Sequence, residues 1–138
     1  MRISITLLVA LGGCGGMGNS NVPTYAEIQA IYNRSCAITP NSCHNSTGPT
    51  MGLDLSAGPS HSLTVGKPSS QVPTMQFIVP GDPDNSYLYR KIDGTFTSIP
   101  YCATHSCGSR MPMVGGPPLT PEQIATVRAW ILGGAPGP

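Results

Sequence analysis

The chain has 138 residues, which is a typical length for a single domain. Only 9% of the residues are charged, whereas 17 are glycine and 15 are proline, so we expect many turns and loops around a modest core. The formal net charge is +1 and the basic residues form no run, which argues against nucleic-acid binding.

The N-terminal residues predict export. A short basic start is followed by an apolar run at 3–11 that is too short to span a bilayer. The Leu-Gly-Gly-Cys sequence that ends at Cys14 resembles the lipobox of bacterial lipoproteins. We therefore predict a lipoprotein signal peptide at 1–13 and a lipidated Cys14. The protein would be anchored to the membrane of the cell envelope, on the periplasmic or outer-membrane side. The alternative is an ordinary secretory signal with a chance cysteine.

The small polar residues at 14–23 predict a flexible tether, which leaves a folded domain at 24–135. The first helix is predicted over 24–34, because Thr24 and Glu27 can form a capping box and apolar residues recur on one face. This helix would deliver Cys36 at its C-terminal end.

Cys36, Cys43 and His44 form the most informative pattern in the chain. A Cys-x-x-Cys-His run marks covalent haem attachment, in which the thiols bond to the haem vinyl groups and the histidine binds the iron. Here six residues separate the cysteines instead of two. The alternative is a Cys36–Cys43 disulfide that closes a small loop in an oxidising compartment.

The sequence predicts loops on both sides of a second helix in the middle of the chain. Residues 45–80 are mostly irregular, and a turn with Asp82 as cap leads into a helix predicted over 84–93, which Gly94 ends. A long loop at 95–119 follows, and loops of this length are often functional. It contains Cys102, His105, Cys107, Met111 and Met113.

The last helix is predicted over 121–132. Thr120 is a typical cap, Pro121 suits the first position, and apolar residues up to Ile131 recur at helical spacing. With the two earlier helices, this predicts an all-α fold with three main helices and long irregular loops.

Four cysteines remain if Cys14 is lipidated, and four cysteines allow three pairings. We expect Cys102 and Cys107 to pair and to restrain the loop before Met111. A zinc site built from these cysteines and the nearby histidines is an alternative, but the spacings match no familiar zinc pattern. His61 and His105 lie in polar stretches and are expected at the solvated surface.

Enzymatic chemistry has little support in this sequence. There are only six carboxylates, and no nucleophile elbow, phosphate loop or His-Glu metal helix is present. We therefore expect an electron carrier at most, and no enzyme.

The order of these features resembles class I cytochrome c, and more narrowly the short cytochrome-c-like domains of exported bacterial proteins, including the planctomycete-type group. The resemblance covers about residues 24–135. It is carried by Cys43-His44, Gly-Leu-Asp-Leu at 52–55, Pro-Gly-Asp-Pro-Asp-Asn-Ser-Tyr-Leu at 80–88, Arg110-Met111-Pro112, and Trp130-Ile131 with Gly134-Ala135.

The resemblance implies an all-α cytochrome c fold and a role in electron transfer with a redox partner protein. Cys36 and Cys43 would be the thioether cysteines of haem c, His44 the proximal iron ligand and Met111 the distal one, with Met113 as a possible substitute. The alternative function is a haem-free domain of the same fold. Disulfides Cys36–Cys43 and Cys102–Cys107 would stabilise it, and it would act as a binding or structural module of the envelope.

Overall fold

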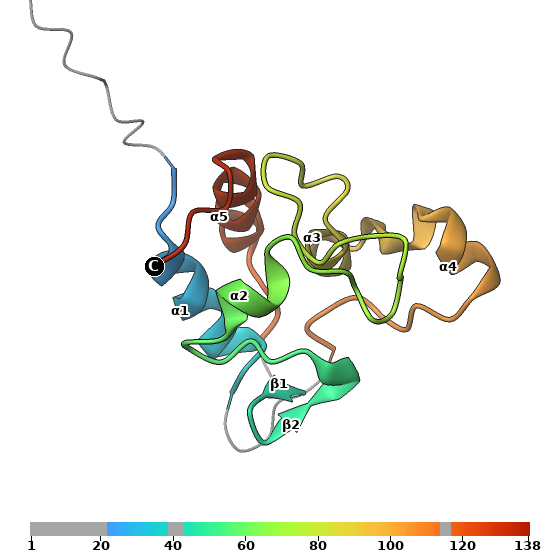
Figure 1. The fold of residues 1–138 in the computed structure, drawn as a ribbon, viewed down its shortest axis with the longest axis horizontal. Coiled ribbons are helices and arrows are strands. Elements are labelled where there is room, and N and C mark those ends of the chain that lie inside the picture. Colours follow the sequence, from blue (N-terminus) through green and yellow to red (C-terminus); the bar gives the residue numbers. More distant parts are fainter. Residues whose placement is uncertain (1–21, 39–42, 114–116) are drawn as a thin grey trace, which may run out of the picture.

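The computed structural model describes residues 22–38, 43–113 and 117–138. In order, the chain forms α1 (Tyr25–Ser35), β1 (His44–Asn45), β2 (Gly48–Pro49), η1 (Thr50–Gly52), α2 (Ser60–Thr64), α3 (Tyr87–Asp93), η2 (Thr95–Ser98), α4 (Pro100–Thr104) and α5 (Pro121–Leu132), as Figure 1 shows. The predicted signal peptide and Cys14 lie outside the described residues, so both stay predictions. None of the helices in the described segments is long and apolar enough to cross a membrane.

The three predicted main helices are confirmed, two of them with their capping boxes. The backbone N–H of Thr24 donates to Glu27 Oε2 at 2.7 Å, and that of Thr120 donates to Gln123 Oε1 at 2.9 Å. Each threonine hydroxyl accepts a hydrogen bond in return from the backbone of the third helical residue. Reciprocal bonds of this kind satisfy backbone donors that the helix itself cannot pair.

The second main helix begins three residues later than predicted, at Tyr87. Asp82 does not cap the helix; it accepts a hydrogen bond from the backbone N–H of Asn85 at 3.1 Å within the preceding turn. The Ser86 hydroxyl donates to the carbonyl of Asp82 and accepts from the backbone of Val79. These bonds keep residues 83–86 in a turn, because they bind the chain back on itself before the helix starts.

The prediction of a purely all-α fold is wrong in one respect, because β1 and β2 form a small antiparallel hairpin. The Asn45 Oδ1 atom accepts hydrogen bonds from the backbone N–H groups of Thr47 at 3.1 Å and Gly48 at 2.9 Å. An asparagine side chain that binds its own following backbone closes a tight turn. The fold is therefore helix-rich with one two-stranded sheet.

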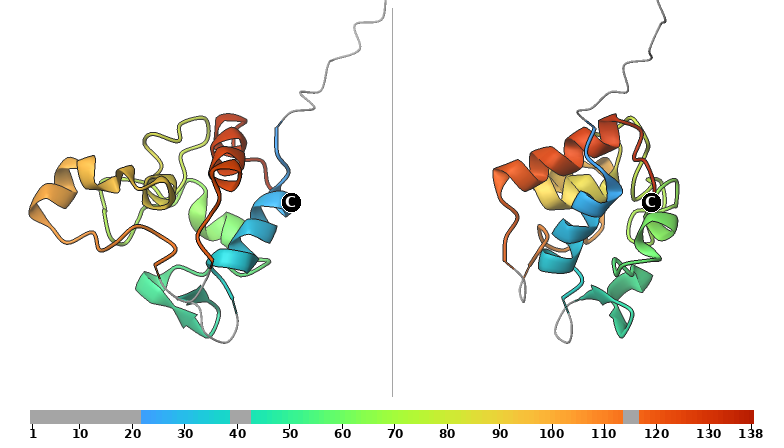
Figure 2. Two further views of the ribbon diagram at one scale, coloured as in Figure 1. Left: turned by 180° about the vertical axis from the view of Figure 1, so that it is seen from behind. Right: turned by 90° about the vertical axis from the view of Figure 1, so that its left-hand side faces the viewer.

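The main core lies where α5 crosses α1, an arrangement that Figure 2 shows from two sides. Its fully buried residues include Ile28 from α1 and Val127, Trp130 and Ile131 from α5. Helix α3 also packs against α5. A second buried cluster consists of Val72, Tyr87, Phe96, Ile99 and Cys107. Because α3 contributes Leu88 and Ile92 to the first cluster and Tyr87 to the second, it joins the two cores.

Candidate functional site

A mostly apolar cavity of about 260 Å³ lies between α1, the hairpin with η1, α3 and the loop after α4. This volume is just below the range of small-molecule sites, roughly 300–1,000 Å³. Leu53, Leu55, Phe77, Leu88 and Ile92 supply much of its apolar wall. Three of the four predicted haem-binding residues also line it, namely Cys36, His44 and Met111.

His44 is held by the hairpin and by the segment that follows it. Its Nδ1 atom lies 3.3 Å from the carbonyl oxygen of Leu53, which accepts a hydrogen bond in the tautomer that carries its proton on Nδ1. Its own carbonyl accepts the backbone N–H of Leu55 at 2.9 Å. A carbonyl bonded to one ring nitrogen orients the ring and leaves the other nitrogen for a metal.

The ionisation of His44 also suits metal binding. Burial lowers the pKa of the imidazole, and hydrogen bonds to the carbonyls of Leu53 and Thr50 oppose this effect. The positive charge of Lys91 lowers the pKa further. The ring is therefore neutral at neutral pH, which is the form that donates a lone pair to a metal ion.

Met111 reaches the cavity from the loop after α4. Its backbone N–H donates to the carbonyl of Lys91 at 2.9 Å, which ties the loop to α3. The Met111 side chain is half-buried and packs against the main core, whereas Met113 is 56% exposed. Both methionines line the cavity, so each thioether can contribute a sulfur atom there. Met111 is the better placed of the two, because the core holds it.

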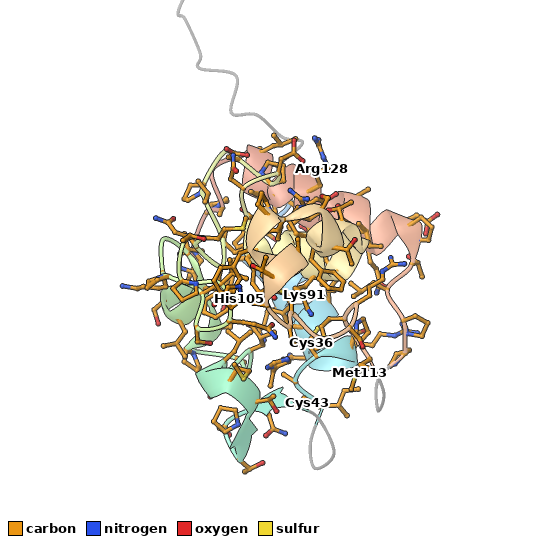
Figure 3. All side chains as sticks on the ribbon, turned by 90° about the vertical axis from the view of Figure 1, so that its right-hand side faces the viewer. Cys36, Cys43, Lys91, His105, Met113 and Arg128 are labelled. Atoms are coloured by element: carbon orange, nitrogen blue, oxygen red, sulfur yellow. A yellow bond between two sulfur atoms is a disulfide. The ribbon has the colours of Figure 1, made fainter. Side chains whose placement is uncertain are left out.

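The two cysteines near His44 are free thiols, so the Cys36–Cys43 disulfide of the alternative prediction is not formed. Cys36 caps the C-terminus of α1, where its backbone N–H donates to Tyr32 at 2.8 Å, and its side chain lines the cavity. Burial raises the pKa of the Cys36 thiol to about 12. Cys43 precedes the hairpin and is exposed, so the two thiols occupy different environments. Figure 3 labels both with Lys91 and Met113.

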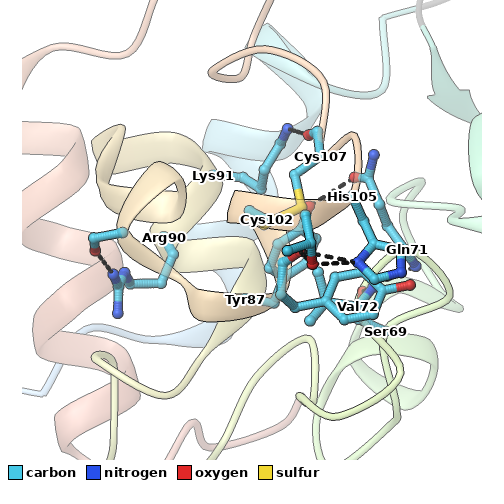
Figure 4. The surroundings of a disulfide bond; sticks show 12 residues. Ser69, Gln71, Val72, Tyr87, Arg90, Lys91, Cys102, His105 and Cys107 are labelled. Atoms are coloured by element: carbon cyan, nitrogen blue, oxygen red, sulfur yellow. Dashed lines mark hydrogen bonds between the residues drawn. A yellow bond between two sulfur atoms is a disulfide. The ribbon is translucent and has the colours of Figure 1, made fainter.

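The predicted Cys102–Cys107 disulfide is confirmed, with an S–S distance of 2.01 Å. It links α4 to the loop that carries Met111, and Cys107 is buried in the second core cluster. Figure 4 shows the Lys91 Nζ atom donating to the carbonyl of Cys107 beside this bond. Because these two cysteines are oxidised, they cannot serve as zinc ligands. Among the described residues, no group of three or more His, Cys, Asp or Glu side chains is placed to hold a metal.

The other two histidines lie away from the cavity lining. His105 is exposed and stacks on Tyr101 with ring centroids 4.0 Å apart. The expectation that His61 is a solvated surface residue is wrong. Its Nε2 atom lies 3.0 Å from the carbonyl of Ala135, and its ring packs edge-on against Tyr25 and Trp130. His61 thus joins α2 to the C-terminal end of the main core.

Lys91 and Gln71 line the same cavity, and sequence reasoning did not single them out. A signal for Lys91 exists in the chain. It follows Leu88 by three residues and precedes Ile92, so it shares the inward face of the helix at 87–93. A lysine on an apolar helix face is unusual enough to mark a site. Nothing local marks Gln71, which reaches the cavity only through the tertiary fold.

No family model matches this chain, and no curated protein or solved structure matches it either.

Proposed function

We propose that this chain is a monohaem c-type cytochrome domain that acts in electron transfer and is anchored to the cell envelope through Cys14. The observation that carries the proposal is that Cys36, His44 and Met111 line one mostly apolar cavity. Met111 is far from Cys36 and His44 in the sequence, and the fold brings its thioether to the same cavity as the imidazole and the thiol.

The donor set fits haem c better than it fits another metal group. The lone pair of a neutral His44 imidazole would bind the haem iron, and the thioether of Met111 would raise the reduction potential of that iron. The free thiol of Cys36 lies in the cavity wall and suits thioether attachment. The free thiol of Cys43 is exposed and does not line the cavity, so it would reach the haem from the rim beside His44. The chain order of the three main helices, α1, α3 and α5, agrees with the resemblance to class I cytochrome c.

A bound haem would supply an iron that alternates between the ferric and ferrous states. His44 and Met111 would hold that iron, and Cys36 and Cys43 would fix the ring covalently. Leu53, Leu88 and Ile92 would keep water away from it, because they form part of the apolar wall. The haem-free alternative is supported less well, because both thiols of its first disulfide are free.

The test is the absorption spectrum of the protein produced in a bacterial strain able to attach haem. We expect an intense Soret band, and haem that stays with the protein during acid-acetone extraction. A colourless protein, whose mass differs from that of the chain only by the hydrogens of its disulfides, would contradict the proposal.

The ligand assignment can be tested with the matched pair Met111→Ala and Met113→Ala. We expect Met111→Ala to abolish the weak near-infrared band of sulfur bound to ferric haem while the haem stays attached. Met113→Ala should keep the band, because that side chain is mostly exposed. Loss of the band in Met113→Ala alone would transfer the distal role to Met113.

A further inference from the structure

Lys91 is a buried cation without a carboxylate partner among the described residues. Its side chain is 5% exposed and lines the cavity. The Nζ atom donates to the carbonyl of Cys107 and lies 4.2 Å from the centre of the Phe96 ring. Burial is the only resolved cause of its lowered pKa, so no described carboxylate acts on it. A buried ammonium group is costly unless an anion or further acceptors compensate it, and it has two more protons to donate.

The side-chain amide of Gln71 supplies a second hydrogen-bond donor near Lys91, beside Gly108. The Nε2 atom of Gln71 and the Nζ atom of Lys91 each lie 3.8 Å from the place where a Cβ atom at Gly108 would be. The Tyr87 hydroxyl donates to Gln71 Oε1 at 2.7 Å, which turns the amide nitrogen away from Tyr87. Gly108 has φ +65° and no side chain, so the space between the two donors stays open.

We propose that this polar end of the cavity, where Lys91 Nζ and Gln71 Nε2 converge beside Gly108, binds a carboxylate of the ligand that fills the apolar part. One ammonium and one amide N–H suit a single negative charge, which favours a carboxylate over a phosphate dianion. The inference deepens the proposed function and rests on it in one respect: if the ligand is haem, the group bound here is one of its carboxylates.

The experiment uses the full chain, produced without the haem-attachment machinery, and two pairs of fluorescent probes. Protoporphyrin IX is compared with its dimethyl ester, and pyrenebutyrate is compared with the uncharged pyrenebutanol. Within each pair only the carboxylate changes. Binding is measured for the unsubstituted chain, for Lys91→Met, and for Lys67→Met, which removes an exposed lysine that does not line the cavity. Circular dichroism checks that the variants are folded.

We expect the unsubstituted chain to bind each acid at least about tenfold more tightly than its neutral partner, because hydrogen bonds to charged groups stabilise by more than neutral ones. Lys91→Met should remove this preference, and Lys67→Met should keep it. Equal binding of acid and neutral probe by the unsubstituted chain overturns the carboxylate site, even if Lys91→Met does not fold. A preference that survives in Lys91→Met overturns it as well.

The two proposals fail in different ways. If neither porphyrin binds but pyrenebutyrate is preferred through Lys91, the haem proposal fails and the carboxylate site stands. If both porphyrins bind equally well, the haem proposal stands and the carboxylate site is overturned. If no probe binds, both are overturned.

Discussion

Cys36 and Cys43 would serve the same attachment site, yet their environments differ. Cys36 lies at the end of α1 and lines the cavity, whereas Cys43 is exposed at the start of the hairpin. Because burial raises the pKa of Cys36 to about 12, its thiol stays protonated at neutral and mildly alkaline pH. The thiolate is the nucleophile, so the two cysteines should react at different rates.

Alkylation of the reduced, haem-free protein with iodoacetamide should therefore modify Cys43 first. We expect Cys36 to react on the order of a hundredfold more slowly at pH 8, and its rate to rise with pH toward about 12, where its thiolate forms. Peptide mass spectrometry measures both rates. In urea the two cysteines should react alike, since unfolding removes the burial. Comparable rates in the folded protein would contradict the buried position of Cys36.

Three of the residues that line the cavity could be picked out by residue type, but its polar end could not. Cys36, His44 and Met111 carry distinctive side chains and were candidates from the sequence. Lys91 and Gln71 have common side chains, and Gln71 gains its role through a hydrogen bond from Tyr87, sixteen residues away. No local pattern carries such a contact, because the tertiary fold brings the two residues together.

The helices also divide into those that local sequence patterns predict and those that depend on contacts between distant residues. The starts of α1 and α5 could be predicted, because a capping box is made by residues three positions apart. The sequence patterns predict neither α2 nor α4, whose five residues are too few to show a helical period. Helix α2 depends on distant partners: the Ser60 hydroxyl donates to Gln29 of α1, and His61 packs against Trp130 of α5.

The Cys102–Cys107 disulfide should stabilise the segment that carries Met111. The two cysteines are five positions apart, so the bridge closes a short loop. By lowering the entropy of the unfolded chain, a loop of this length stabilises the folded protein by about 2 kcal/mol. We expect the double variant Cys102→Ala with Cys107→Ala to lower the free energy of unfolding by about that amount. Urea denaturation followed by circular dichroism measures the difference.

A reducing agent provides the control for this prediction. In the haem-free protein Cys36 and Cys43 are free, so reduction should destabilise the unsubstituted chain and leave the double variant unchanged. If reduction shifts the double variant equally, a bond between other cysteines contributes to stability. Identical stability of both proteins under oxidising conditions would contradict the stabilising role of the bridge.

At the scale of the whole molecule, the cavity lies between two core clusters. Phe77 packs against both of them and lines the cavity, and α3 supplies residues to both. The cavity walls are therefore backed by packed side chains on each side, so the shape of the site depends on the stability of both clusters. Within the first cluster, α1 packs against α5.

Adjacent residues of α5 provide a matched test of that packing. Ile131 is fully buried and belongs to the first cluster, whereas Leu132 is 50% exposed. Ile131→Ala should lower the free energy of unfolding by about 2–5 kcal/mol, because it removes buried methyl groups and leaves a cavity. Leu132→Ala removes a side chain of similar size and should change it by no more than about 0.5 kcal/mol. Urea denaturation followed by Trp130 fluorescence measures both variants.

Since α5 also packs against α3, Ile131→Ala should weaken probe binding in the cavity as well, although Ile131 does not line it. Equal effects of the two substitutions would mean that α5 does not pack against α1 through this face, and the walls of the cavity would then lack the backing described above.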